Sequence, residues 1–178
     1  MEERKYEPSL LFCGILTSRG FPPSLKEELE ERWGRIVYTS PVFDFSYTDY
    51  YIQEMGDGIK RFFIAFERLV MPDCLAQAKL FSNEIEKRYA EDGKRKINLD
   101  PGLMGISNII LATTKNRAHR IAIGHNLYAE VTLIYHHSGY ESFSWTYSDY
   151  KDERIQNELM KIREIYKKIR KEGGQQGN

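Results

Sequence analysis

Cysteine is scarce in this sequence, and neither sign of charge is in excess. The two cysteines, Cys13 and Cys74, have no cysteine close to them in the sequence, so we expect neither a disulfide framework nor a cysteine-type zinc site. Lys and Arg together number 26, and so do Asp and Glu. Because non-specific nucleic-acid binding requires many uncompensated cations, this balance argues against nucleic acid as a general partner.

Long apolar runs are missing as well. No stretch approaches the roughly 18 residues that a membrane-spanning helix needs, and the start, MEERKYE, lacks the apolar core of a signal peptide. We therefore expect a cytoplasmic protein without a membrane partner. The residues that are present, 41% hydrophobic and 13% aromatic, supply the core of one domain. The expected boundaries are a single α+β domain over residues 1–172 and a disordered tail over residues 173–178.

The first hundred residues alternate between strand and helix patterns. The expected strands are 10–17, 36–45, 62–70 and a segment from residue 96, and the expected helices are 24–33 and 74–89. Pro41 cannot donate to a β-ladder, so the second strand is expected to be kinked or to lie at an edge. The order β-α-β-β-α-β is that of the ferredoxin-like fold, an antiparallel sheet with two helices on one face.

The rest of the chain is expected to contain strands followed by one helix. The strands are 108–114, 120–123, 127–135 and 140–145, and apolar residues at helical spacing mark a helix over 152–171. The predicted fold class is therefore α+β, with a ferredoxin-like βαββαβ core, an antiparallel β extension and a C-terminal helix.

The two strands that flank residue 125 can be aligned. If Gly124-His125-Asn126 forms the loop, Ile123 pairs with Leu127 and Arg120 pairs with Glu130. This register collects apolar residues on one face and polar residues on the other. Arg120 and Glu130 are then either a partly exposed ion pair worth less than about 1 kcal/mol or part of a binding site.

A second group of polar residues lies next to this pair, at the end of the preceding strand. Strand ends are places where side chains converge on small ligands. Hydroxyl, ammonium and guanidinium groups together suit a phosphate or a carboxylate. We therefore predict a site for a small anionic ligand. Its binding residues are Thr113, Thr114, Lys115, Arg120 and Tyr128.

Three residues are candidates for acid–base chemistry. Glu130 would hold Arg120 in position or, with a raised pKa, act as an acid or a base. Asp100 precedes Pro101-Gly102, so it either caps a tight turn or projects from a strand end as a base or metal ligand. His119 is either a catalytic histidine or a hydrogen-bonded core histidine, since strict alternation along the strand turns its side chain toward the core.

Other polar groups give weaker signals. Asp44, Asp49 and Glu54 lie among tyrosines in a predicted loop, which either closes over a ligand or is an ordinary polar connection. The four histidines and two cysteines follow no recognisable metal-ligand spacing, so no metal site is predicted and no cofactor is assigned.

Five motifs in a fixed order make the sequence resemble a known family. They are FDFSYTDYYIQEMG, KINLDPG, LATTKNRAHRI, YAEVTL and TYSDY, within residues 10–166. The family they resemble is an uncharacterised prokaryotic domain of unknown function, which implies no activity, cofactor or catalytic residue. Some relatives carry a GTP-binding label, but this sequence has neither a GxxxxGK[ST] loop nor an Asn-Lys-x-Asp element.

Three functions from different classes remain. The first is binding or turnover of a small phosphate- or carboxylate-bearing ligand, such as a nucleotide. The second is RNA binding on a ferredoxin-like sheet by the aromatic residues Phe62, Phe66, Tyr38 and Tyr128, although the usual basic-glycine-aromatic signature is missing. The third is partner binding without catalysis, through the C-terminal helix or an open sheet edge.

Overall fold

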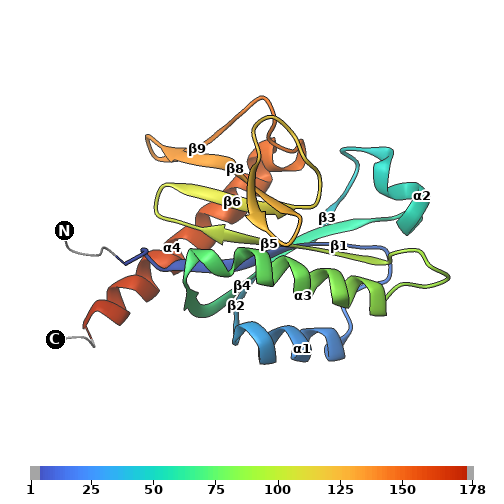
Figure 1. The fold of residues 1–178 in the computed structure, drawn as a ribbon, viewed down its shortest axis with the longest axis horizontal. Coiled ribbons are helices and arrows are strands. Elements are labelled where there is room, and N and C mark those ends of the chain that lie inside the picture. Colours follow the sequence, from blue (N-terminus) through green and yellow to red (C-terminus); the bar gives the residue numbers. More distant parts are fainter. Residues whose placement is uncertain (1–4, 176–178) are drawn as a thin grey trace.

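A large antiparallel sheet organises the computed structural model, which describes residues 5–175 (Figure 1). The strands are β1 (Ser9–Thr17), β2 (Ile36–Thr39), β3 (Phe43–Asp44), β4 (Lys60–Val70), β5 (Ile97–Met104), β6 (Asn108–Thr113), β7 (Ile121–Gly124), β8 (Leu127–His136) and β9 (Gly139–Ser142). The helices are α1 (Pro23–Trp33), α2 (Ile52–Met55), α3 (Leu75–Arg88) and α4 (Glu153–Gln175), with short 3-10 turns at η1 (Asp49–Tyr51), η2 (Pro72–Cys74) and η3 (Asp149–Lys151). The predicted α+β character, the antiparallel sheet and the C-terminal helix are confirmed.

The strand order in the sheet is β2-β4-β1-β5-β6-β8-β7, with β3 paired to β4 and β9 paired to β8. The pairs β1–β4, β1–β5 and β2–β4 are all antiparallel. All nine residues of β1 are buried, as expected for a continuous apolar run between two covered faces.

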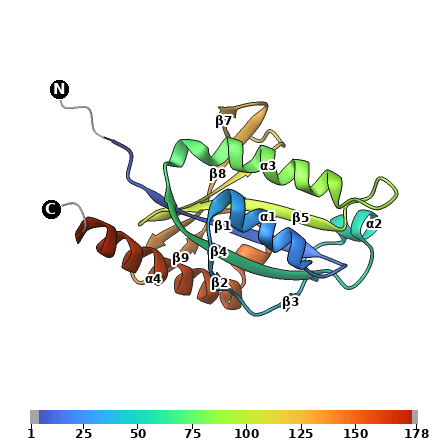
Figure 2. The same ribbon diagram turned by 90° about the horizontal axis from the view of Figure 1, so that it is seen from below.

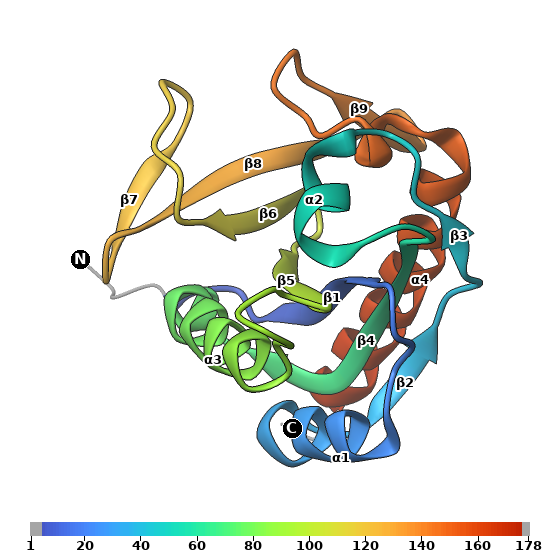
Figure 3. The same cartoon turned by 90° about the vertical axis from the view of Figure 1, so that its right-hand side faces the viewer.

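Helices cover both faces of the sheet around β1. Alternate residues of β1, Leu11 among them, pack in one cluster with α1 and α3, whereas Phe12 packs in another with α4. Figures 1 and 2 show α1 and α3 side by side, and Figure 3 shows α4 on the opposite side of the sheet. The stripe that predicts α4 is the buried one, since Leu159 and Tyr166 face the sheet at 0% and 1% exposure.

Pro41 divides the predicted strand 36–45, as its missing N–H suggests. The chain pairs with β4 as β2, leaves the ladder and returns as β3. At the break the Ser40 N–H donates to Phe63 O at 2.8 Å, and Ser40 Oγ accepts from the Phe63 N–H at 2.9 Å. One serine thus satisfies the backbone of β4 where β2 ends.

The β7–β8 hairpin keeps part of the predicted register. Ile121 pairs with Ala129, in agreement with the prediction, but Gly124 rather than Ile123 pairs with Leu127, because a bulge shifts the register after Ala122. The loop consists of two residues, His125 and Asn126, with φ angles of 54° and 57°. Two positive φ angles are typical of a type I′ turn, whose twist matches that of the strands. The predicted three-residue loop is therefore wrong.

The last helix overlaps the start of the predicted tail. α4 extends to Gln175, over the first three residues of the segment 173–178. A glycine costs a helix about 1 kcal/mol relative to alanine, which a long helix anchored on the sheet tolerates near its end. Residues 176–178 lie outside the described part of the chain.

Candidate functional site

A cleft with a volume of about 1010 Å³ lies where β5 and β6 separate. The whole of β5 pairs with β1, but its pairing with β6 starts only at Gly102. Extending that register would set Asp100 opposite Thr113, and both residues line the cleft instead. The segments 45–54 and 145–150, together with α3, form the other walls.

The sequence predicts a tight turn at Pro101-Gly102, and this prediction is wrong. β5 continues through both residues to Met104. Gly102 is required for close packing rather than for a turn, because an added Cβ would lie 2.5 Å from Phe12 Cζ. Pro101 precedes the first β6 pair, at a position where a missing N–H costs no ladder hydrogen bond to β6.

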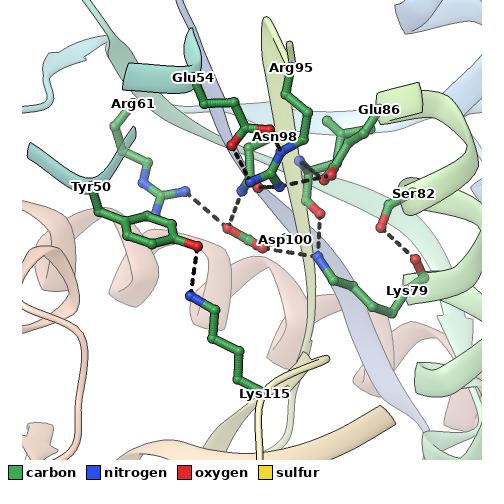
Figure 4. Close-up of polar contacts among 11 residues, drawn as sticks. Tyr50, Glu54, Arg61, Lys79, Ser82, Glu86, Arg95, Asn98, Asp100 and Lys115 are labelled. Atoms are coloured by element: carbon green, nitrogen blue, oxygen red, sulfur yellow. Dashed lines mark hydrogen bonds and ion pairs between the residues drawn. The ribbon is translucent and has the colours of Figure 1, made fainter. Parts of the chain in front are cut away.

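Asp100 is the central acidic group of the cleft (Figure 4). Its Oδ1 accepts a hydrogen bond from Lys79 Nζ at 3.1 Å, and its Oδ2 accepts from Asn98 Nδ2 at 2.6 Å. Arg61 Nη1 lies 3.9 Å from Oδ2. The Asp100 side chain remains 26% exposed, so one side of the carboxylate faces the cleft.

Two polar residues of α3, Lys79 and Glu86, support the free edge of β5, while Ser82 between them donates to the Lys79 carbonyl of the helix itself. Lys79, Ser82 and Glu86 follow helical spacing, and all three are buried. Lys79 Nζ donates to Leu99 O at 3.0 Å, and Glu86 Oε1 accepts from the Leu99 N–H at 2.7 Å. These side chains supply the hydrogen bonds that a neighbouring strand would otherwise make. The sequence signal was a polar stripe beside the apolar stripe of this helix, and the sequence interpretation missed it.

The charged side chains around Asp100, at the floor of the cleft, shift one another's pKa values. Burial alone would raise the pKa of Asp100, but Lys79 and Arg61 outweigh it and hold that pKa below its ordinary value. Burial would lower the pKa of Lys79, and Asp100 and Glu86 reverse this effect and raise it. Glu86 itself has a raised pKa, mainly because it is buried. Asp100 is therefore a carboxylate and Lys79 an ammonium at neutral pH.

Replacing Asp100 by asparagine is expected to flatten the loss of stability in acid. Because the folded-state pKa of Asp100 is depressed, its stabilisation is fully present above the unfolded-state pKa of about 3.9 and is lost as the pH falls through the folded-state value. The wild-type protein should exceed Asp100→Asn in free energy of unfolding at neutral pH, and this difference should shrink below about pH 4. Urea unfolding at a series of pH values measures the difference, with the exposed Asp73→Asn as control. A difference that grows on acidification would contradict the ion pairing of Asp100.

Arg95 connects the segment that carries α2 to the floor of the cleft. Its Nε and Nη2 donate to Glu54 Oε1 and Oε2, each at 2.7 Å. Its Nη1 donates to Asn98 Oδ1 at 2.8 Å and to Glu86 Oε2 at 3.2 Å. The forked bond to Glu54 fixes the position of α2 over the cleft.

The acidic and aromatic loop over residues 43–56 therefore contributes to the cleft wall only in part. Glu54 and Tyr51 line the cleft, as does Tyr50, whose side chain is 57% exposed. Asp44 instead forms a surface ion pair with Lys60. Tyr50, Tyr51 and Glu54 therefore belong to the cleft wall, and Asp44 does not.

Three exposed cationic side chains of the cleft wall, Lys87, Lys115 and Arg117, are named here the rim cations. Lys115 Nζ lies 3.0 Å from Tyr50 Oη and 4.1 Å from the centre of its ring. Among residues 5–175, none of the three cations forms a salt bridge to an acidic side chain. They are free to neutralise an added negative charge.

Arg120 and Glu130 form the predicted pair, but the pair is buried. Arg120 Nε donates to Glu130 Oε2 at 2.7 Å, and the two side chains are 7% and 1% exposed. Arg120 also reaches the Lys115 carbonyl at 2.6 Å and Tyr147 Oη at 3.1 Å. Of the two alternatives for this pair, the partly exposed one is wrong, because segment 145–150 covers this face of β8.

His119 and Tyr128 take positions that the sequence interpretation did not give them. His119 Nε2 lies 3.0 Å from Glu130 Oε2, and its ring stacks on Trp145 with centroids 4.9 Å apart. Strict alternation fails at His119 because β7 begins only at Ile121. Tyr128 is half-buried on β8. Neither residue is part of the cleft wall, and Glu130 lies behind Arg120.

The structure thus brings together part of the predicted site and adds groups that were missed. Of the predicted residues, Asp100, Thr113, Thr114, Lys115 and Arg120 line the cleft. The cationic residues of the wall are Arg61, Lys79, Lys87, Arg95, Lys115, Arg117 and Arg120, and the acidic residues are Glu54, Glu86, Asp100 and Asp149. Within residues 5–175, no three His, Cys, Asp or Glu side chains are grouped as a metal site would require. No helix in this range has both the length and the apolar character of a membrane span.

Comparison with known proteins gives a family without an activity. A family model described as "Domain of unknown function (DUF4416)" matches residues 7–166. No curated protein and no solved structure matches the chain. The match extends over nearly the same residues as the five sequence motifs, so the resemblance they indicated is confirmed.

Proposed function

The chain belongs to the DUF4416 family, a domain of unknown function, and we propose that it binds a small anionic ligand in the cleft beside Asp100. The observation that carries the proposal is the charge of the wall, in which seven side chains are cationic and four are acidic. The three exposed rim cations, Lys87, Lys115 and Arg117, have no competing carboxylate among the described residues. A phosphate or carboxylate placed there completes the local charge balance.

The residues divide into those that would contact the ligand and those that position them. Lys115 offers an ammonium and Thr113 and Thr114 offer hydroxyl groups at the end of β6. Arg120 Nε donates to Glu130, and Nη1 of the same guanidinium donates to the Lys115 carbonyl. We therefore assign Arg120 to positioning Lys115 rather than to contacting the ligand. For turnover the cleft offers the Asp100 carboxylate, which would accept a hydrogen bond from the substrate while Lys79 holds it in place.

The cleft is favoured over base stacking on the sheet. Phe62 and Phe66 are 5% and 0% exposed, in the cluster that packs with α1 and α3. Tyr38 donates its hydroxyl hydrogen to Glu158 of α4. An RNA-binding sheet needs open aromatic faces, and helices cover these three.

We also propose that the first half of the chain is a ferredoxin-like core. The order β2-β4-β1-β5, with each neighbouring pair antiparallel, supports this assignment. The packing of α1 and α3 in one cluster on the same face supports it too. The β extension then adds β6 to β5 and leaves the cleft at the point where those two strands part.

Replacing Lys115 by methionine tests the anion site. The side chain is exposed, so we expect an unchanged melting temperature without ligand, but about tenfold weaker binding of anions, equivalent to about 1.4 kcal/mol. Thermal shift and calorimetry with phosphate, ribose 5-phosphate, AMP and citrate measure both quantities. Lys26→Met, an exposed lysine on α1 outside the cleft wall, is the matched control. If no anion of this panel binds the wild-type protein at millimolar concentration, the proposed function is wrong.

A further inference from the structure

Two buried polar atoms at the cleft have no hydrogen-bond partner among the described residues. They are Arg61 Nη1 and Tyr150 Oη. Both residues belong to the cleft wall, although they are only 4% and 1% exposed. A buried donor without a partner costs stability, so in a folded protein such atoms indicate a missing water or ligand atom.

The two atoms lie together over one glycine. A Cβ added to Gly14 of β1 would be 2.9 Å from Arg61 Nη1 and 3.2 Å from Tyr150 Oη. Gly14 faces Asp100 in the β1–β5 register. Any larger residue at position 14 would clash with Arg61 Nη1, so the glycine allows both polar groups to lie close to the backbone of β1 beside Asp100.

The position of Asp100 defines which chemical group would fit. Its Oδ2 lies 3.9 Å from Arg61 Nη1, which is too long for a direct hydrogen bond but suits one oxygen atom bonded to both. Lys79 and Arg61 already neutralise this carboxylate. An ammonium would add a third cation, whereas a hydroxyl donates to Asp100 and accepts from Arg61 or Tyr150 without adding charge.

We propose that the ligand is a phosphate ester of a polyhydroxy compound, the chemistry shared by sugar phosphates and nucleotides. Its phosphate lies at the rim with Lys115 and Arg117, and a hydroxyl group lies at the floor with Asp100, Arg61 and Tyr150. This inference rests on the proposed anion site and adds the second group of the ligand. The volume of about 1010 Å³ supports it, because inorganic phosphate alone would leave most of the cleft empty.

The test compares ribose 5-phosphate with tetrahydrofurfuryl phosphate, which keeps the ring and the phosphate but has no free hydroxyl. By calorimetry, the wild-type protein should bind ribose 5-phosphate at least about tenfold more tightly. Tyr150→Phe removes one unpartnered oxygen, so it should fold at least as stably as wild type and lose most of this preference. Tyr140→Phe is the matched control, because Tyr140 Oη is also buried without a partner among the described residues but lies outside the cleft wall. That variant should keep the full preference.

The outcomes separate this inference from the proposed function. Equal binding of the two phosphates overturns the hydroxyl subsite and leaves the anion site standing, whereas no binding of either overturns both. If both Tyr150→Phe and Asp100→Asn keep the wild-type preference for ribose 5-phosphate over tetrahydrofurfuryl phosphate, Tyr150 Oη binds water rather than ligand. That result overturns the hydroxyl subsite. AMP distinguishes the sources, since tighter binding than ribose 5-phosphate assigns a nucleotide and equal binding assigns a sugar phosphate.

Discussion

Replacing Asp149 by alanine is expected to lower the free energy of unfolding by about 3 to 5 kcal/mol. Arg61 donates to Asp149 Oδ2 from Nε at 2.9 Å and from Nη2 at 2.5 Å. The two side chains are only 5% and 4% exposed. Without Asp149 the guanidinium stays buried with only the more distant Asp100 to balance it, and a buried charge that loses its partner is strongly destabilising.

A surface pair of the same geometry provides the control for Asp149→Ala. Arg35 donates to Glu67 Oε2 from Nε at 3.0 Å and from Nη2 at 2.8 Å, but the two side chains are 68% and 44% exposed. Glu67→Ala should therefore cost less than about 1 kcal/mol. Urea unfolding of both variants against wild type measures the contrast. Equal losses would show that burial does not set the strength of the Arg61 pair.

The Arg61–Asp149 pair also explains how a distant segment shapes the cleft. Asp149 belongs to η3, just before α4, whereas Arg61 lies on β4. Their bond fixes two of the guanidinium nitrogens and leaves Nη1 turned toward Asp100. Local sequence patterns cannot pair two residues 88 positions apart, even though Asp149 lies within the TYSDY motif.

Local periodicity accounts for the parts of the fold that could be predicted. A continuous apolar run, alternation with period 2 and stripes with period 3.6 depend only on neighbouring residues, so they identify β1, β8 and α4 respectively. The turn expected at Pro101-Gly102 failed for a tertiary reason. Position 102 requires glycine because Phe12 of β1 lies too close for a side chain there. Pro101 fits within β5 because pairing with β6 begins only after it.

Some residues of the candidate site could likewise be predicted from local sequence patterns, and others could not. Lys115 could be predicted because it follows the polar end of β6, whereas Asp100 was selected through a turn that does not form, and it lies inside β5 where β6 no longer pairs with that strand. Lys79 and Glu86 were missed because the sequence interpretation considered only the apolar residues of their helix. Both side chains bind the unpaired edge of β5, which no helical pattern predicts. Which edge stays open is a property of the whole sheet, so it cannot be derived from any one segment.

Replacing Arg120 by alanine is expected to cost about 3 to 5 kcal/mol of unfolding free energy, whereas Lys115→Ala should leave stability nearly unchanged. From the sequence alone both substitutions look equivalent, since both remove a cation from one predicted site. In the structure Lys115 is exposed, but Arg120 is the close cationic partner of Glu130, which is 2% exposed. Urea unfolding of the two variants, followed by circular dichroism, measures the difference.

A double variant distinguishes two causes of the loss of stability: the missing hydrogen bonds of Arg120 and the buried Glu130 carboxylate left without its partner. If Arg120→Ala is destabilising because Glu130 remains buried without a guanidinium, then Arg120→Met combined with Glu130→Leu should recover most of the loss, since apolar residues of similar volume often replace a buried ion pair without cost. His119 would then lose its contact with Glu130 but keep its stacking on Trp145. If the double variant is as unstable as Arg120→Ala, the guanidinium stabilises the fold through its bonds to the Lys115 carbonyl and Tyr147 instead. Either result assigns Arg120 to the support of the rim, and the exposed Lys115 is the residue whose loss should affect ligand binding alone.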